Sequence, residues 1–174
     1  MPDLTAHRTV VLDLDPPIWE RFFTVAPLVV VGTREPDGGD DLAPKHLAMP
    51  RSWRNHFGFV CTPRHRTYLA SLAASPRCGD GSKPVAAALP TFAASQVQGA
   101  FLQDGYLFLE CELERFVDDI DDNALIIGRI VAASAAEDAL RSADRDDEDL
   151  LLHAPLLAYL HPGRFAEIAS THVM

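Results

Sequence analysis

The chain has 174 residues, 48% of them hydrophobic and 23% charged, which is the composition of one globular domain with a core of its own. Its formal net charge of −10 argues against nucleic acid as the main partner, because most of the surface would repel phosphate. No apolar run reaches the roughly 18 residues of a membrane span, and no leader-like N-terminus precedes the widely spaced Cys61, Cys78 and Cys111, so we expect a cytoplasmic protein with free thiols and no membrane partner.

The first half of the chain predicts a short helix and two strands. Residues 15–23 combine an N-capping aspartate with proline in the first turn, which favours a helix. Residues 27–33 are rich in valine and predict a strand, which a turn over residues 35–41 ends. A second strand is expected over residues 56–62, with Gly58 at a bulge or a close backbone approach.

The second half predicts three more strands. Residues 105–116 alternate, which indicates a half-buried strand with one wet face. The inward set is Leu107, Leu109, Cys111 and Leu113, and the outward set is Glu110, Glu112 and Glu114. Residues 123–131 predict a more fully buried strand, and residues 155–160 a short apolar strand that ends at His161-Pro-Gly163.

Helical signals in this half are weak. Ser134 and Glu137 have the spacing of a capping box and predict the start of a helix. The acidic run over residues 144–149 is interpreted as a solvent-exposed segment, which belongs either to this helix or to a loop. Strands thus outnumber helices and are rarely joined by them. We therefore expect a single mainly β domain over residues 1–174, an antiparallel barrel with a few short peripheral helices.

Charge is unevenly distributed. Between Asp41 and Asp80 the chain has no acidic residue, although it is acidic overall. The basic residues of this acid-free stretch are Lys45, Arg51, Arg54, Arg64, Arg66 and Arg77. Charge of one sign collected on one segment costs self-repulsion, unless an anion binds there or acidic faces fold over it. Taken by itself the pattern favours the second explanation, with an anion site as the alternative.

Metal and nucleophile motifs are incomplete. Asp119, Asp121 and Asn123 match the start of a calcium loop, but Ala124 replaces its glycine and Ile130 its bidentate glutamate, so we expect no metal. There is no G-x-S-x-G, and Cys61 lies in an apolar strand, where a core role is expected. No glycine-rich phosphate loop is present. Arg64, Arg66 and Thr67, just after a predicted strand, nevertheless offer phosphate donors, and a solvated basic turn is the alternative.

Taken together, these segments resemble the flavin reductase-like family of FMN-binding split barrels. The similarity spans roughly residues 25–168, and each motif is weak alone, but their order is that of the family. The matching segments are Leu28–Gly38, Asp41–His46 (Asp-Leu-Ala-Pro-Lys-His against the family's Asn-x-Ala-Pro-x-Ser), Arg64–Thr67, Asn123–Val131 with its Ile-Gly-Arg, and the closing Pro155–Phe165.

The resemblance implies an antiparallel split β-barrel of the Greek-key type, forming a homodimer with FMN near the subunit interface. It implies transfer of hydride or electrons from NADH or NADPH to free flavin or another acceptor, with a partner oxygenase as one destination. Carried over by position, Ala43, Pro44, Lys45 and His46 line the flavin, and Arg64, Arg66 and Thr67 hold its phosphate. It identifies no catalytic acid or base.

Two departures from the family pattern stand out. Asp41 replaces an asparagine, and Lys45-His46 replaces a small hydroxyl residue, which would shift flavin potential or specificity. The family also continues past the threonine turn into a further strand, whereas Tyr68 here runs directly into Leu69. Because losing a barrel strand leaves unpaired edges, we expect additional residues in the natural chain at this join, and also after Met174.

Two alternatives stay open. The first is a non-enzymatic split barrel that carries or senses flavin or haem. The second is a barrel that binds no cofactor and only dimerises, in which case replacing Arg64 and Arg66 changes no ligand binding.

Overall fold

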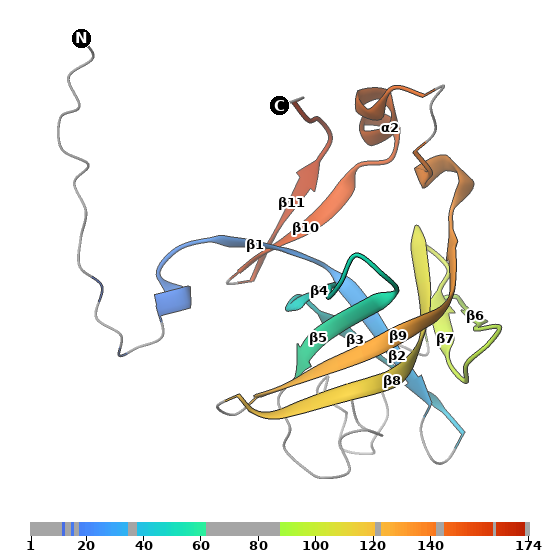
Figure 1. The fold of residues 1–174 in the computed structure, drawn as a ribbon. Helices are drawn as coiled ribbons and strands as arrows, with labels where there is room; N and C mark the ends of the chain where they lie inside the picture. Colours follow the sequence, from blue (N-terminus) through green and yellow to red (C-terminus); the bar gives the residue numbers. More distant parts are fainter. Residues whose placement is uncertain are drawn as a thin grey trace.

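The computed structural model of the chain describes residues 12, 15, 18–34, 38–61, 88–120 (119 and 120 as backbone only), 123–141, 145–161 and 163–172. Within these residues the protein is mainly β, and the strands pair antiparallel (Figure 1). The strands are β1 (Thr24–Pro27), β2 (Val29–Arg34), β3 (Asp40–Lys45), β4 (Ala48–Pro50), β5 (His56–Cys61), β6 (Thr91–Ala93), β7 (Ala100–Leu102), β8 (Leu107–Ile120), β9 (Asn123–Ala135), β10 (Leu156–His161) and β11 (Arg164–Ile168).

The largest sheet has the order β4-β5-β9-β8, and the long β8–β9 hairpin forms one side of it, with β8 at the edge (Figure 1). The remaining described strands form the sheets β1-β10-β11, β2-β3 and β6-β7. Among the described residues these four sheets do not close into one barrel. The mainly β class is therefore confirmed, and barrel closure with Greek-key order stays a prediction.

The core lies between the β2–β3 hairpin and the inner face of the large sheet. Ala48, Phe59, Cys61 and Ile126 are buried together. Val29, Val31, Phe57 and Phe116 pack around them. This arrangement confirms that Cys61 is a core residue, and it fixes β3, next to β2, against the end of β5.

Most predicted strands are confirmed. The run over residues 27–33 is divided, because β1 ends at Pro27 and pairs with β10, whereas β2 pairs with β3. The turn over residues 35–41 was extended too far, since β3 already begins at Asp40 and pairs Asp40 with Arg34. Gly58 does mark a close approach, because an added Cβ would lie 2.7 Å from Cγ of Arg51.

The helix predictions were less accurate. Instead of a helix over residues 15–23, the described residues form a single 3-10 turn, η1 (Ile18–Glu20). The capping box was wrong: Ser134 lies inside β9, and the 3-10 helix η2 (Glu137–Ala139) starts from Ala136 with no side-chain cap. The acidic run contributes the start of α2 (Asp147–His153), where the Asp146 carboxylate accepts a hydrogen bond from the Glu148 N–H. No helix among the described residues is long and apolar enough to cross a membrane.

The predicted faces of β8 are partly wrong, and the regular alternation is broken where the ladder between β8 and β9 shifts register, at Glu110/Cys111 and again at Leu113/Arg115. Such bulges re-aim side chains. Leu107 and Leu113, predicted to point inward, are 51% and 54% exposed. Glu110, predicted to be wet, is only 7% exposed.

Glu110 is buried because the loop between β6 and β7 closes over it. Its carboxylate accepts hydrogen bonds from the backbone N–H groups of Ser95, Gln96 and Val97 and from the Ser95 hydroxyl, at 2.6–3.0 Å. The Gln96 N–H and the Ser95 hydroxyl contribute most to lowering the pKa of Glu110 to about 2. The ionised carboxylate therefore holds this loop on β8.

The backbones of β2 and β7 approach each other closely at Gly32. An added Cβ on Gly32 of β2 would lie 2.6 Å from the carbonyl oxygen of Ala100 in β7. Since real Cβ atoms do not approach an oxygen so closely, only glycine lets these two backbones come together.

Candidate functional site

The β2–β3 hairpin positions the first group of predicted site residues. Ala43 faces Val31 across the hairpin and is 1% exposed, whereas the following Pro44 points outward. Lys45 ends the strand, and His46 follows it directly; both are half-buried. The structure thus brings Ala43, Lys45 and His46 together at the end of β3, and leaves Pro44 on the outer side.

The ring of His46 stacks on two rings of β10. Its centroid is 4.6 Å from that of Tyr159 and 5.8 Å from that of His161, whose plane is inclined by only 22°. Tyr159 is itself held in place, because its hydroxyl accepts a hydrogen bond from the Gly163 N–H at 2.9 Å and its ring contacts Phe165. We call His46, Tyr159 and His161 the histidine stack. It joins the end of β3 to the β1-β10-β11 sheet.

The surroundings of His46 disfavour its protonated form. Burial lowers the pKa of His46, and the neighbouring His161 and Lys45 lower it further. The Nδ1 atom of His161 is buried and has no hydrogen-bond partner among the described residues. A bound anion beside His46 would therefore favour the protonated form of its imidazole.

Lys45 also acts on the end of β5. Burial raises the pKa of the Cys61 thiol, and the charge of Lys45 opposes that rise. A buried thiol with a raised pKa is the opposite of an activated nucleophile, which agrees with a core role for Cys61. Because Cys61 ends β5, the chain leaves this point directly into the segment that contains the predicted phosphate donors.

The other predicted residues lie outside the described part of the chain. Arg64, Arg66 and Thr67 are among them, and so is the join of Tyr68 and Leu69. The start of the rejected calcium loop at Asp119 and Asp121 is likewise not described at the side-chain level. Among the residues whose side chains are described, no three histidine, cysteine, aspartate or glutamate side chains gather as metal ligands would.

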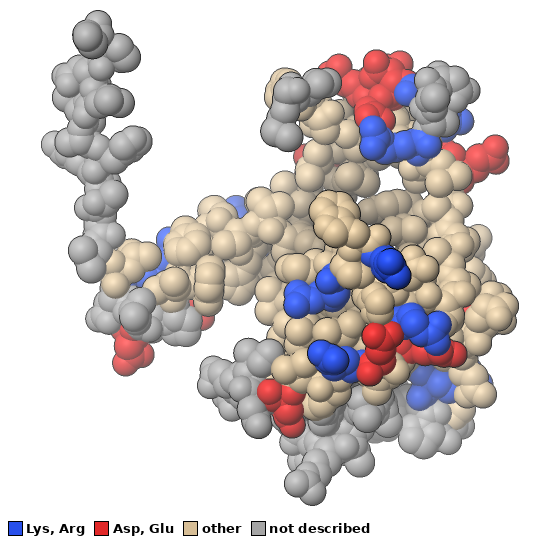
Figure 2. Space-filling model, viewed as in Figure 1, with Lys and Arg blue, Asp and Glu red and all other residues tan. Residues whose placement is uncertain are grey.

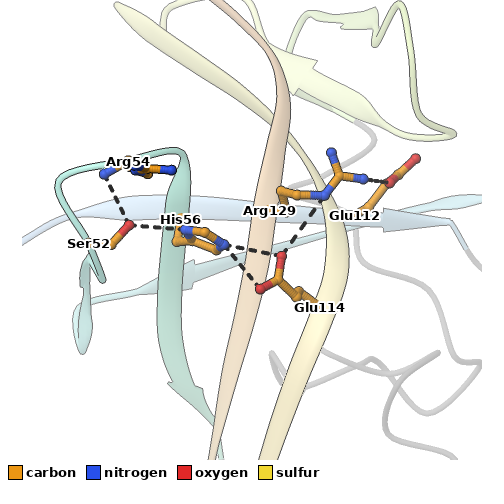
Figure 3. Close-up of polar contacts among 6 residues, drawn as sticks. All are labelled: Ser52, Arg54, His56, Glu112, Glu114 and Arg129. Atoms are coloured by element: carbon orange, nitrogen blue, oxygen red, sulfur yellow. Dashed lines mark hydrogen bonds and ion pairs between the residues drawn. The ribbon is translucent and has the colours of Figure 1, made fainter.

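A second histidine lies on the outer face of the large sheet (Figure 3). The His56 Nε2 atom is 3.1 Å from both carboxylate oxygens of Glu114, and its Nδ1 atom is 3.0 Å from the Ser52 hydroxyl. An ionised carboxylate only accepts hydrogen bonds, so Nε2 donates to Glu114. The Arg54 backbone N–H also donates to the Ser52 hydroxyl.

Arginine completes this outer polar row, which consists of Ser52, His56, Glu112, Glu114 and Arg129. Arg129 pairs with Glu112 at 2.5 Å and lies 3.9 Å from Glu114. The register shift at Leu113/Arg115 leaves Glu114 without an opposite residue on β9, which lets its carboxylate reach across that strand to β5. Basic and acidic atoms accordingly alternate in the middle of the face seen in Figure 2. Within this row each charge has an opposite charge beside it.

Sequence reasoning missed two of the residues in the histidine stack. Tyr159 and His161 were treated only as the end of a strand. Being two residues apart in a predicted strand, they share one face, which was the available signal. Nothing in the sequence pattern, however, indicates that this face meets His46.

The residues at the end of β3 are compatible with FMN. Pro44, Lys45 and His46 keep accessible surface that a flavin ring could contact, whereas Ala43 is small and buried, so that no bulky side chain stands at its position. A phosphate needs cations and N–H donors, which Lys45 and the imidazoles of His46 and His161 can supply. The buried, unpartnered Nδ1 of His161 is a polar atom that a ligand can satisfy.

The chain resembles known proteins in structure, but no family model and no curated protein sequence matches it. One similar solved structure is an FMN-binding protein from Thermus thermophilus, with 19% identity and a TM-score of 0.71 over 96% of this chain and 99% of that one. Another is a split-barrel protein from Shewanella frigidimarina assigned as a flavin reductase, with 14% identity and a TM-score of 0.70 over 86% of this chain and 85% of that one. Flavoredoxin from Methanosarcina acetivorans is also similar (13%, 0.68, 95% and 94%). The chain therefore has the fold of the flavin reductase-like, FMN-binding split-barrel proteins.

Proposed function

We propose that this protein binds FMN and acts as an NAD(P)H-dependent flavin oxidoreductase. The observation that carries the proposal is the fold match, which extends over nearly the whole of this chain and of a protein that binds FMN. The convergence of Lys45, His46 and buried Ala43 at the end of β3 supports it. These are positions that the sequence resemblance had assigned to the flavin.

Each residue has a definite task in this proposal. The small side chain of Ala43 lets the isoalloxazine ring lie close to the β3 backbone, while Pro44 shapes the rim. The Lys45 ammonium attracts the phosphate, together with the donors of Arg64, Arg66 and Thr67 from the segment that follows β5. His46 lies between the edge of the isoalloxazine ring and β10. Bound FMN supplies reversible acceptance of a hydride from the nicotinamide.

We further propose that the working unit is a homodimer. The β1-β10-β11 sheet carries exposed apolar side chains, among them Val25 (72% exposed), Leu157 (54%) and Phe165 (59%). Exposed apolar groups of this kind on a folded chain are typical of an interaction surface. Leu157 and Phe165 share the face of this sheet on which Tyr159 lies, and Val25 is on the other face. A second copy meeting the first face would cover Leu157 and Phe165.

The proposed compartment is the cytoplasm, and the proposed partners are FMN, a nicotinamide cofactor and an oxygenase that uses the reduced flavin. Cys61 and Cys111 are both free thiols, which is what a reducing compartment maintains. The oxygenase rests on the sequence resemblance alone.

The deciding experiment is an absorption spectrum of the purified protein, followed by titration with FMN and addition of NADH or NADPH. We expect a yellow protein whose flavin bands bleach with the nicotinamide. Retained FMN without NAD(P)H oxidation would instead identify a carrier or sensor. A colourless protein that takes up no FMN would contradict the proposal.

Paired variants test the phosphate donors. The double substitution Arg64→Ala, Arg66→Ala should weaken FMN binding. It should weaken riboflavin binding much less, because riboflavin lacks the phosphate. Arg54→Ala is the matched control from the same acid-free stretch, because the contact of Arg54 with Ser52 uses its backbone N–H and survives the substitution. Equal FMN affinity in all three proteins would favour a barrel in which these arginines hold no ligand.

A further inference from the structure

The histidine stack joins two parts of the chain that are far apart in sequence. His46 follows β3, and Tyr159 and His161 lie on β10, where His161 pairs with Thr24 of β1. Among the described residues, the charged or titratable groups that act on His46 or contact its ring are Lys45 from its own hairpin and Tyr159 and His161 from β10. Apart from the phenol of Tyr159, all of these groups are cations in their protonated forms.

The part of the chain that the structure describes offers neither imidazole a polar partner. Among the described residues, no hydrogen bond or ion pair involves the side chain of His46 or of His161, and Nδ1 of His161 is buried. His56 shows the opposite situation, since both of its ring nitrogens have partners and one partner is a carboxylate. A polar ring that is buried without a partner is costly, and most such atoms in proteins are satisfied by something.

Like charges that converge with unsatisfied donors are the elements of an anion site. Protonation of His46 is opposed by His161 and Lys45, and an anion placed among the three groups would remove that opposition. The protonated rings would in turn donate charge-assisted hydrogen bonds to it.

We propose that His46, His161 and Lys45 form an anion-binding site for a carboxylate or phosphate group, which binds more tightly when the imidazoles are protonated. The anion is either the phosphate of FMN or an anionic group of a separate redox partner. Only the first of these rests on the proposed function. The proposed function assigned His46 and Lys45 to the flavin, and the new elements are His161, the pairing of the two imidazoles and the dependence on protons.

The test measures binding of sulfate and of benzoate by calorimetry at about pH 5.5 and about pH 8, on either side of the ordinary histidine pKa of about 6.5. Both probes keep a constant charge over this range, so any change in affinity comes from the protein. We expect about tenfold tighter binding at the lower pH, which corresponds to coupling of one pKa unit. The double variant His46→Asn, His161→Asn should lose this difference, and His56→Asn should retain it.

A second measurement does not depend on variants. The imidazole resonances of His46 in the wild-type protein should titrate at higher pH when sulfate is saturating. Equal affinity at both pH values, an unmoved titration, or a double variant that keeps the pH dependence would overturn the proposal.

Competition identifies the source of the anion. If FMN displaces sulfate and riboflavin does not, the site holds the flavin phosphate. If sulfate still binds to FMN-loaded protein, the site serves a separate anion. FMN uptake with no proton-dependent sulfate or benzoate site would overturn this inference and leave the proposed function standing.

Discussion

The outer polar row and the histidine stack each contain a histidine, but they place it in opposite electrostatic surroundings. In the outer polar row, His56 lies between Ser52 and the carboxylate of Glu114, and Arg129 pairs with Glu112. In the histidine stack, His46 lies beside His161 and Lys45, which oppose its protonation. The first region needs nothing further to be electrostatically satisfied. In the second region, the described residues give the imidazoles of His46 and His161 no hydrogen-bond partner, which is why we assign ligand binding to it.

The largest effect is expected at Glu110, whose carboxylate accepts more hydrogen bonds than any other among the described residues. Replacing the buried Glu110 with glutamine removes the carboxylate that accepts from Ser95, Gln96 and Val97, and should lower the thermal unfolding midpoint by several degrees at neutral pH. The folded pKa of Glu110 lies below its unfolded value of 4.5, at about 2. Its stabilisation is therefore complete above about pH 4.5 and is lost as the pH falls towards 2.

Denaturant unfolding measured across this acid range checks the prediction. Glu110→Gln should lose the steep part of the acid dependence, while Glu112→Gln, which alters an exposed pair, should keep it. Parallel pH curves for Glu110→Gln and the wild-type protein would show that the loop clamp does not contribute.

The next largest effect belongs to Lys45. Replacing it with alanine should weaken FMN binding by about tenfold to a hundredfold, because a charge-assisted hydrogen bond contributes about 1.5–3 kcal/mol. Fluorescence titration of FMN measures the loss, and Arg54→Ala is expected to bind as the wild-type protein does. If the Lys45→Ala protein bound FMN with unchanged affinity, Lys45 would not be part of the proposed site.

A smaller effect is expected from His46 in anion-free buffer. Its pKa is lowered in the folded protein by burial, His161 and Lys45, so the unfolded chain binds protons more readily. Stability is then highest above about pH 6.5 and falls as the pH drops below that value. His46→Asn should flatten this part of the stability curve in urea unfolding experiments. If His56→Asn flattened this part of the stability curve instead, the uncompensated histidine would be His56, which contradicts the comparison of the two regions.

The smallest effect should come from the outer polar row. Glu114→Gln breaks contacts with His56 and Arg129, yet both carboxylate contacts lie on an exposed face. Exposed ion pairs contribute about 0–1 kcal/mol to the free energy of unfolding. Added salt should reduce even this difference. A loss well above 1 kcal/mol would mean that the row is more than a charge-balanced surface.

Regular local patterns were predicted well from the sequence. The apolar run that forms β5 and the alternating run that forms β8 have the composition of strands, so local propensity and pairing agree there. β3 was missed because Asp40, Asp41 and Pro44 are poor strand formers. Their pairing with β2, which no local signal contains, decides the conformation.

The site was predictable only in part for the same reason. Ala43, Lys45 and His46 could be assigned because they lie in one ordered motif. His161 could not, because its role depends on β10 meeting the end of β3. The burial of Glu110 depends in turn on the loop between β6 and β7, which precedes β8 in the chain. Long-range contacts of this kind are absent from spacing and composition.

The meeting of Gly32 with the Ala100 carbonyl has a consequence for anyone who engineers this protein. In a library in which every position is varied, position 32 should tolerate no substitution, although it has no chemical role. Even alanine would force β2 and β7 apart, and the hairpin that ends in Lys45 would move with β2. Loss of ligand binding at this position would therefore report a displaced scaffold and should not be counted as identifying a binding residue.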